Sequence, residues 1–374
     1  MPNPILAPNP AGHAATTPGT LFAELRRGVL GQDRALRFVA VAVHKHVLGK
    51  VAGNILLIGS SGTGKTTLMN NLQRLYDTTP GLERFRAVTI LNANLLVDSE
   101  RTEFRGDRLL AAVEQRARAI VGERAGFAEL AQAMGRATVC VDEIDKMSTL
   151  VAGRPNPVGV VLQQGLLTLM EGEKLTYPLR AWEDGAERER AVEIDTRGMM
   201  FVCGGAFEGL YDQVYFRVTK SGSGERLKTE AVKGADGSVR LETRFSLAEY
   251  LKMKDLFDFG MVPQFLARFD KVVVLNDLDR GVLQEILLHA IDSPFARSRR
   301  YFAALGIELE LDELAAALVA ERAALENRTG ARALRDVFAE VINALEFDPW
   351  REVVEDDARR LLRIDAERVR RTLR

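Results

Sequence analysis

The stretch Asn54–Thr67 constrains this 374-residue chain more than any other part of it. It reads NILLIGSSGTGKTT, a short apolar run followed by a turn that fits G-x-x-x-x-G-K-[ST] at every fixed position. Glycines let the backbone curl so that several N–H groups point at one phosphate chain, and the helix that follows directs its positive end at the same anion. The stretch therefore predicts a buried strand, a phosphate-binding loop and a helix, in that order.

The spacing also assigns chemical roles within the loop. We expect Lys65 to reach the β- and γ-phosphates of a nucleoside triphosphate and the Thr66 hydroxyl to bind Mg²⁺. ATP and Mg²⁺ are therefore the expected ligands. The other residues of this stretch predicted to contact the nucleotide are Gly59, Ser60, Ser61, Gly62, Thr63, Gly64 and Thr67.

A second motif, TVCVDEID, ends an apolar run at residues 138–145. Cleavage of a phosphate chain needs a carboxylate near the metal and a base that orients water. Asp142, where the run ends, is the predicted Mg²⁺ ligand, and Glu143 is the predicted catalytic base. Asp145 and Lys146 are expected to be structural or interface residues.

Composition limits the class of protein. Hydrophobic residues make up 47% of the chain and charged residues 28%, which is ordinary for a soluble globular protein. The formal net charge of -1 provides no overall basic field, so nucleic-acid binding stays possible but unsupported. No apolar run approaches the ~18 residues of a membrane span, and the N-terminus does not resemble a secretory signal. No membrane contact is expected, and a reducing cytoplasm is the expected location.

Neither the cysteines nor the histidines suggest a metal centre. Cys140 and Cys203 lie in apolar, strand-like runs without metal-ligand spacing, so buried packing is their expected role. His44 and His46 are two positions apart and would face different sides of a helix.

Apolar strand-like runs alternate with helix-like runs as far as residue 279. This alternation predicts an α/β fold with a five-stranded parallel sheet covered on both faces. Between the strands, residues 92–106 are expected to be irregular, 171–190 to be a charged segment, and 221–244 to be a long loop or hairpin. The expected strands are Ile55–Ile58, Arg86–Leu91, Thr138–Val141, Gly198–Cys203 and Lys271–Leu275.

Two changes in composition predict the domain organisation. Residues 1–20 are rich in Pro, Ala, Thr and Asn, and we expect a flexible tail. Residues 21–279 form the predicted large α/β subdomain. Residues 280–374 form the predicted small subdomain, mostly helical with one β-like stretch at Ile307–Leu311.

From about Leu21 to its end, the chain resembles the AAA+ module of the ClpX family of hexameric protein unfoldases, and more distantly the HslU family. Both nucleotide motifs match the family pattern, and further blocks match in the same order. These blocks are VLGQDRALRFVAVAVHKH, VLQQGLLTLMEG, IDTRGMMFVCGGAFEGL, FGMVPQFLARFDKVVVLNDLD and RTGARALRDVFAEVI.

The resemblance implies roles that the residues alone do not. It implies a P-loop AAA+ fold and an ATPase that works as a homohexamer on protein substrates. It places Val29 and Leu30 at the nucleotide base. It makes Arg268 the arginine finger for ATP bound to the neighbouring subunit, and Arg332 the sensor-2 arginine acting in cis. Taken alone, either arginine would be read as a surface ion-pair partner. The sensor-1 region falls near residues 203–205, where no polar sensor is obvious.

The chain also departs from the family pattern. We expect no counterpart of the Cys-rich zinc domain, and Glu225-Arg226-Leu227, the first two of them charged, stand where the family has its apolar peptidase-docking tripeptide. An apolar pocket should not accept such a segment, so we predict that ClpP is not a partner. The second pore segment is shortened to Ala152–Pro157, and the entrance loop is not recognisable in Trp182–Arg190.

The substrate-gripping loop of the family, Gly-aromatic-Val-Gly, aligns with Glu103-Phe104-Arg105-Gly106. Phe104, Arg105 and Gly106 are therefore the predicted pore-loop residues, and Arg105 would favour acidic segments or a polyanion. The alternative is an ordinary loop phenylalanine that touches the core.

Two functions from different classes follow. The first is an ATP-dependent protein-remodelling or unfolding ATPase, a ring hexamer that hydrolyses ATP at subunit interfaces independently of ClpP. The alternative is a nucleotide-controlled scaffold or switch that acts on DNA or a dedicated partner complex without threading protein. Arginine-rich helices within residues 359–374 could serve it, although a solvated basic face explains them as well. An inactive paralogue is disfavoured because Lys65, Asp142, Glu143, Arg268 and Arg332 are all present.

Overall fold

The structure is a computed structural model that describes residues 16–50, 53–98, 100–151, 153–220, 227–233, 239–325, 330–356 and 359–373. The chain falls into two compact units. The sheet unit consists of Lys45–Ile58 and Pro80–Val274. The loop unit consists of Met1–His44, Gly59–Thr79 and Leu275–Arg374, as far as these are described.

A five-stranded parallel sheet forms the centre of the sheet unit, in the order β13-β1-β10-β5-β2. Its strands are rich in Val, Ile and Leu, and such runs are stable where both faces of a parallel sheet are buried. The prediction of five parallel strands is confirmed. The strand bounds are β1 (Asn54–Ile58), β2 (Val88–Asn92), β5 (Thr138–Asp142), β10 (Met200–Gly205) and β13 (Phe269–Val274).

Three helices of the sheet unit bury their apolar stripes in one core with the sheet. Val113, Leu130 and Leu166, one from each helix, are fully buried in the same cluster as Phe201 of β10. These helices are α5 (Gly106–Val121), α6 (Phe127–Met134) and α7 (Pro157–Met170). Shorter elements complete the unit: η1 (Glu83–Phe85), η2 (Ala93–Leu96), η3 (Ile144–Met147), η4 (Thr196–Gly198), α8 (Leu210–Thr219), α9 (Leu247–Tyr250), α10 (Met253–Asp258) and α11 (Pro263–Leu266).

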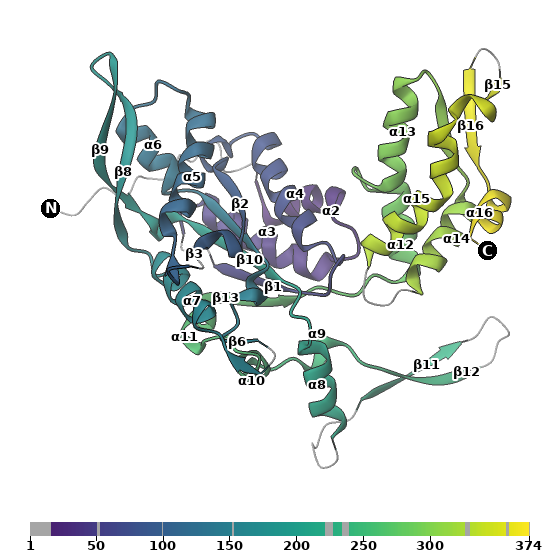
Figure 1. Cartoon of the computed structure of the whole chain (residues 1–374), viewed down its shortest axis with the longest axis horizontal. Coiled ribbons are helices and arrows are strands. Elements are labelled where there is room, and N and C mark those ends of the chain that lie inside the picture. Colours follow the sequence, from purple (N-terminus) through teal and green to yellow (C-terminus); the bar gives the residue numbers. More distant parts are fainter. Residues whose placement is uncertain are drawn as a thin grey trace. The chain divides into compact units, whose positions relative to one another are not determined.

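A long antiparallel hairpin of β8 (Lys174–Glu183) and β9 (Ala186–Asp195) replaces the expected charged segment (Figure 1). Burial alternates along β8, where Tyr177, Leu179 and Ala181 face inward between exposed residues. Asp184 and Gly185 both have positive φ, 50° and 81°, as a tight hairpin turn requires. The Asp-Gly pair was a usable hairpin signal that the charge pattern obscured.

The described residues also form four smaller sheets. The hairpins in the sheet unit are β3 (Val97–Asp98) with β4 (Glu103–Phe104), β6 (Leu150–Val151) with β7 (Arg154–Pro155), and β11 (Lys228–Lys233) with β12 (Val239–Arg244). The last one realises the hairpin alternative expected for residues 221–244. The fourth is the three-stranded sheet of the C-terminal lobe described below.

The loop unit contains α2 (Pro18–Gly28), the first part of α3 (Asp33–Val47), and α4 (Lys65–Thr78). The Nδ2 of Asn71 on α4 donates to the carbonyl oxygen of Leu25 on α2 at 2.6 Å. A Cβ at Gly28 would lie 2.5 Å from the Asn71 side chain, so this close contact requires glycine.

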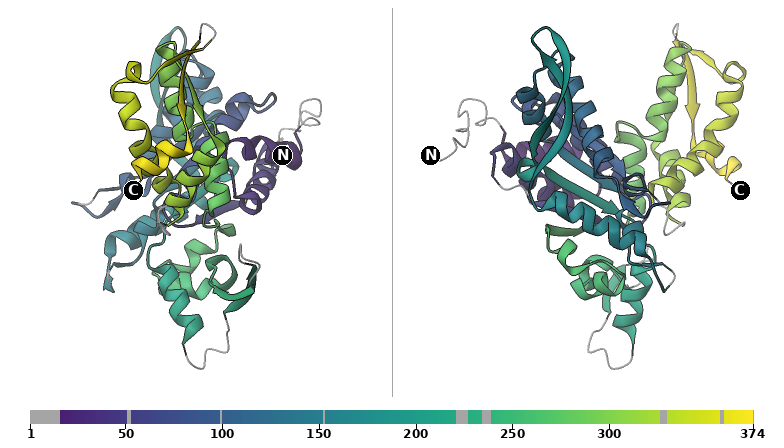
Figure 2. Two further views of the ribbon diagram at one scale, coloured as in Figure 1. Left: turned by 90° about the vertical axis from the view of Figure 1, so that its right-hand side faces the viewer. Right: turned by 60° about the vertical axis from the view of Figure 1, so that its left-hand side comes forward.

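The rest of the loop unit is a C-terminal lobe with its own core, which includes Phe302, Phe338 and Ile364. Its helices are α12 (Arg280–His289), α13 (Pro294–Ala304), α14 (Glu313–Ala324), α15 (Ala331–Phe347) and α16 (Ala366–Thr372), with η5 (Pro349–Arg351). A three-stranded sheet runs beside them in the order β14-β16-β15 (Figure 2). Its strands are β14 (Glu308–Leu311), β15 (Val354–Asp356) and β16 (Arg359–Ile364).

This sheet corrects one expectation for the C-terminus. Residues 359–364 were expected to lie in arginine-rich helices, but they form β16, and only α16 is helical. Leu362 and Ile364 are buried, whereas Arg363 between them is exposed, which is the period-2 pattern of a strand.

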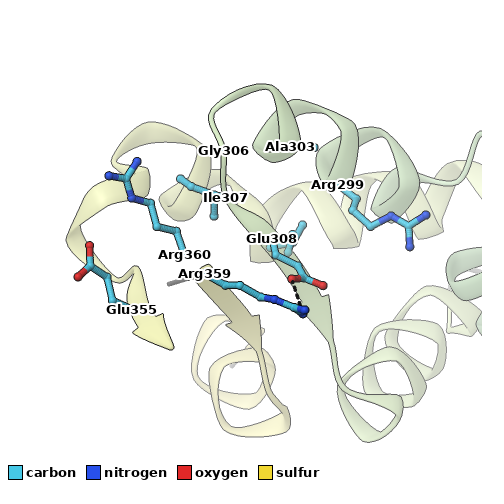
Figure 3. A pocket seen from close by; sticks show the side chains of 9 residues that line it. Arg299, Ala303, Gly306, Ile307, Glu308, Glu355, Arg359 and Arg360 are labelled. Carbon is cyan, nitrogen blue, oxygen red and sulfur yellow. Dashed lines mark ion pairs between the residues drawn. The ribbon is translucent and has the colours of Figure 1, made fainter. Parts of the chain in front are cut away.

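A hollow of about 870 Å³ lies in the lobe, lined by residues of α13, β14, β15 and β16 and by the segment between α13 and β14. Figure 3 shows Arg299 and Arg360 at opposite ends of it, with the Arg359–Glu308 ion pair between them. The three guanidinium groups do not converge on one point. The hollow therefore lacks the arrangement expected of a phosphate site.

No helix among the described residues combines the length and the apolar character needed to cross a membrane. Some expectations fall on residues that the structure does not describe: the tail as far as residue 15, Ala152 of the shortened pore segment, and Glu225-Arg226 of the docking stretch.

Candidate functional site

The phosphate loop follows β1 directly in the chain and adopts a conformation that its glycines permit. Gly62 and Gly64 have φ of 80° and 101°, a region that side chains strongly disfavour. A Cβ at Gly59 would lie 2.7 Å from the Thr63 hydroxyl oxygen, which itself donates to the Ser60 carbonyl at 2.8 Å. The loop is therefore curled tightly at the N-terminus of α4.

Lys65 is the first residue of α4, and its side chain turns back into the curl of the loop. Its Nζ donates to the carbonyl oxygens of Gly59 at 2.5 Å and Ser60 at 2.9 Å, and the residue is 8% exposed. The charged amino group of Lys65 therefore lies within the loop whose backbone amides are expected to bind an anion.

Gln32 supports the loop from outside and was missed from the sequence. Its buried amide donates to the Thr63 carbonyl at 3.1 Å and to the Asn276 carbonyl at 2.9 Å, and it accepts from the Asn276 N–H at 2.9 Å. Ser60 also donates to Asp277 at 3.1 Å. The only signal was that Gln32 lies inside the VLGQDRAL block, beside the predicted base-binding residues Val29 and Leu30.

Two of the predicted contributors from outside the loop are held near it within the loop unit. Val29 is buried, and its Cγ1 would lie 3.9 Å from a Cβ at Gly64. The helix that carries Arg332 begins on the loop itself, because the Ala331 N–H donates to the Gly62 carbonyl at 3.0 Å. Arg332 is the second residue of α15 and is exposed. Leu30 is half-buried.

The two predicted carboxylates belong to the sheet unit, at the end of β5. Asp142 is the last residue of the strand, and its Oδ1 accepts the backbone N–H of Glu143 at 2.8 Å. Glu143 has φ of 59° and ψ of 36°, a left-handed conformation that costs a non-glycine residue about 1–3 kcal/mol. Such strain is maintained when the position of the side chain matters.

Two groups contact the Glu143 carboxylate. Lys146 Nζ donates to its Oε2 at 2.5 Å, and this hydrogen bond raises the pKa of Lys146. The Nδ2 of Asn92, the last residue of β2, donates to the same oxygen. Asn92 is level with Asp142 across the β2–β5 pair and was missed from the sequence. Asp145 accepts the Ala206 N–H at 3.2 Å, in agreement with a structural role.

Arg268 lies in the sheet unit between α11 and β13, on the surface. Its guanidinium group forms an ion pair with Glu171, the residue that caps α7. The Arg268 carbonyl accepts the side-chain amide of Asn54 at 3.0 Å, which fixes the backbone from which the guanidinium extends.

Comparison with known proteins identifies the family. The profile of the AAA domain (Cdc48 subfamily) matches residues 50–272. The chain belongs to this family of AAA+ ATPases. It is similar to "ATP-dependent Clp protease ATP-binding subunit ClpX" of Bacteroides thetaiotaomicron, with 28% identity over 336 residues that cover 86% of this chain and 74% of the relative. The same-named protein of Borrelia duttonii is 28% identical over 357 residues, which cover 91% and 76%.

These relatives confirm the ClpX-like resemblance, the α/β P-loop fold and the assignment of ATP hydrolysis. Membership of this family implies ATP binding, and the loop at Gly59–Thr66 stays the predicted nucleotide site. Within the AAA+ chain, the predicted sensor-1 region, residues 203–205, ends β10 and is buried. Burial raises the pKa of the Cys140 thiol to about 12 and that of Cys203 well above its usual range, so both stay protonated.

In the predicted pore loop of this AAA+ ATPase, the Phe104 ring packs against the core. Phe104 is half-buried at the end of β4, and its ring rests on Gly165 of α7. A Cβ at Gly165 would lie 2.1 Å from Phe104 Cγ, so the ring occupies the space that this glycine leaves open. This packing favours the alternative in which Phe104 contacts the core. Arg105 is paired on the surface with Asp107 at 2.7 Å.

Proposed function

We propose that this AAA+ ATPase remodels or unfolds protein as a ring hexamer, with ATP hydrolysed at subunit interfaces and without ClpP. The observation that carries the proposal is the contrast between the two arginines. Arg332 lies on a helix that begins on the subunit's own phosphate loop, whereas Arg268 lies on the surface, held by one carboxylate. This difference supports a cis role for Arg332 and a trans role for Arg268.

In the proposed site, the loop amides and Lys65 bind the phosphates of ATP. The Thr66 hydroxyl and the Asp142 carboxylate offer the oxygen ligands that Mg²⁺ prefers. No group of three or more His, Cys, Asp or Glu residues in the described ranges is placed to hold a metal by itself. The ion would therefore be bound by these two side chains together with phosphate oxygens, and it would neutralise part of the phosphate charge.

Glu143 would orient the attacking water and accept its proton at the carboxylate, which Asn92 and Lys146 hold in place. Arg268 of one subunit and Arg332 of the next would stabilise the charge that develops on the transferred phosphoryl group. Independence from ClpP rests on Glu225-Arg226-Leu227 in the sequence, and a cytoplasmic location remains part of the proposal.

The test measures ATPase activity with and without a permanently unfolded protein, and separately with single- and double-stranded DNA. We expect the unfolded protein to stimulate turnover and Glu143→Gln to abolish turnover while retaining bound ATP. Removing one catalytic group costs about 10²–10⁴-fold in rate. Stimulation by DNA alone would contradict the remodelling function.

The second candidate is the nucleotide-controlled scaffold or switch, and the position of Phe104 favours it. A ring that is packed on Gly165 does not project as a substrate-gripping side chain must. Phe104→Ala separates the two. If the loop grips substrate, the variant keeps its basal ATPase and loses protein remodelling. If the protein is a scaffold, partner assembly persists and no remodelling is detected in either form.

A further inference from the structure

A single buried glutamine joins the loop that follows the catalytic carboxylates to the segment that carries Arg268. Gln163 lies in the middle of α7 and is fully buried. Its Nε2 donates to the Met147 carbonyl at 2.6 Å and to the Gly260 carbonyl at 3.1 Å. Its Oε1 accepts the Val262 N–H at 2.7 Å.

The first of these bonds connects Gln163 to the hydrolytic carboxylates. Met147 is the last residue of η3, the short helix that begins directly after Glu143. The same helix is closed by the Lys146 N–H, which donates to the Glu143 carbonyl at 3.1 Å. A shift of the Glu143 backbone would therefore also move the Met147 carbonyl.

The other two bonds connect Gln163 to Arg268. Val262 caps α11, whose one turn is closed by the Leu266 N–H bonding to the Val262 carbonyl at 3.0 Å. The Arg268 N–H then donates to the Phe265 carbonyl at 3.1 Å. Only one short, hydrogen-bonded turn separates the glutamine from the arginine.

Helix α7 contacts this segment a second time. Glu171, at the C-terminal cap of α7, forms the ion pair with the Arg268 guanidinium. Gln163 and Glu171 are eight residues apart, which corresponds to ~12 Å along one rigid helix. Gln163 binds the backbone at Val262, where the segment begins, and Glu171 binds the Arg268 guanidinium group.

We propose that Gln163 is a positioning residue that fixes Arg268 relative to the loop carrying Glu143, so that each subunit's own site sets the placement of its arginine on the neighbouring site. The proposal rests on the trans role of Arg268 proposed above. A buried amide suits this task because a polar group that loses a hydrogen bond in the core finds no water to replace it. Movement of either segment away from Gln163 is therefore unfavourable.

The test uses rings that are mixed from two full-length variants. The donor subunit carries Glu143→Gln, so it cannot hydrolyse its own ATP but keeps Arg268. The acceptor subunit carries Arg268→Ala, so it keeps its hydrolytic site but offers no arginine. Each variant alone is inactive, and a mixture is active only where a donor arginine reaches an acceptor site.

Gln163→Met is then added to the donor, whose own site contributes no turnover. We expect the restored ATPase activity to fall about tenfold or more, because small misplacements of a catalytic group have large effects on rate. The KM for ATP should not change, since ATP binds to the unaltered phosphate loop of the acceptor. The same substitution in the acceptor should cause a smaller loss, because that subunit has no arginine to misplace.

Gln164→Met in the donor is the matched control, since it makes the same change at the adjacent, exposed position of α7. It should leave the restored activity unchanged. If the Gln163→Met donor does not fold or assemble, Val262→Pro provides the second variant. It removes the N–H that donates to Gln163 and replaces the valine side chain, and the Val262 φ of −70° suits proline.

Two results would overturn the proposal, and they are distinguishable. Equal losses in donor and acceptor, or no loss in the donor, would contradict positioning by Gln163 while leaving the trans arginine intact. Failure of the two parent variants to complement each other would contradict the trans role of Arg268, and the proposal for Gln163 with it.

Discussion

The phosphate loop and the Phe104 loop are held in place in different ways. The phosphate loop owes its shape to its own backbone, with φ of 80° at Gly62 and 101° at Gly64. The ring of Phe104 owes its position to a glycine 61 residues away, Gly165, which leaves room for it on α7. A local motif therefore predicts the first loop, whereas no local motif could predict the second.

The largest expected effect tests the local loop. Lys65→Ala should weaken ATP binding about a thousandfold, because two charge-assisted contacts to phosphate contribute about 1.5–3 kcal/mol each. Fluorescent-nucleotide titration measures the loss. Lys45→Ala, an exposed lysine on α3, is the control and should bind ATP normally. Normal binding by Lys65→Ala would show that the curled loop is not the phosphate site.

His46 is a second residue whose environment comes from distant parts of the chain. Its ring is buried against Phe85, Nε2 donates to the Gly198 carbonyl at 2.9 Å, and burial lowers its pKa from 6.5 to about 4. Between these two values the unfolded chain binds a proton that the folded chain does not. The free energy of unfolding should therefore fall as the pH drops from 6.5 to 4, by up to about 3 kcal/mol.

Urea unfolding at several pH values checks this expectation. His46→Gln should remove that part of the pH dependence, and His44→Gln on the same helix should keep it. An identical pH dependence in the parent protein and in His46→Gln would mean that His46 is not the group responsible.

Gly165→Ala tests whether Gly165 positions Phe104, because the sign of the change in unfolding free energy depends on this contact. In a helix without a neighbour at this point, alanine would stabilise by about 1 kcal/mol. With Phe104 docked, the new methyl group would overlap the root of the ring, and we expect a loss of about 2 kcal/mol. In a Phe104→Ala background the same substitution should become stabilising. Calorimetry or urea unfolding of the four proteins gives the result, and additivity would disprove the contact.

Arg105→Ala should have the smallest effect. Its ion pair with Asp107 is on the surface, where such pairs contribute little, so the urea midpoint should stay within error. If the loop contacts substrate, ATPase stimulation by an acidic unfolded protein should fall about twofold, while a basic one is unaffected. Arg101→Ala, in the exposed turn before it, serves as the control. A large stability loss would place Arg105 among the residues that hold the loop in place.

The same distinction explains how much the sequence could predict. The five strands follow from apolar runs, and the sheet confirms them. Fixed spacings predicted the phosphate loop, Asp142 and Glu143, and the structure shows Asp142 as the last residue of β5. Gln32, Asn92 and Gln163 were not predicted, because an amide becomes informative only when its partners are known. The partners of Gln32 and Gln163 include Asn276, 244 residues away, and Gly260, 97 residues away.

The secondary structure shows the same limit. The β8–β9 hairpin was overlooked because charged side chains on its exposed positions hid the alternating Tyr177, Leu179 and Ala181. Strand β16 was overlooked for the same reason, since the exposed Arg363 separates its buried Leu362 and Ile364. In both cases pairing with a neighbouring strand decided the structure.

The chain passes between its two units four times, at residues 44–45, 58–59, 79–80 and 274–275. The segment Gly59–Thr79 is hydrogen-bonded to Ala331 directly and is linked to Asn276 through Gln32. Exchanging the C-terminal lobe with that of a relative would therefore also exchange hydrogen-bonding partners of the phosphate loop. Chimeras of this protein should be designed as paired replacements of both stretches, because neither is an independent module.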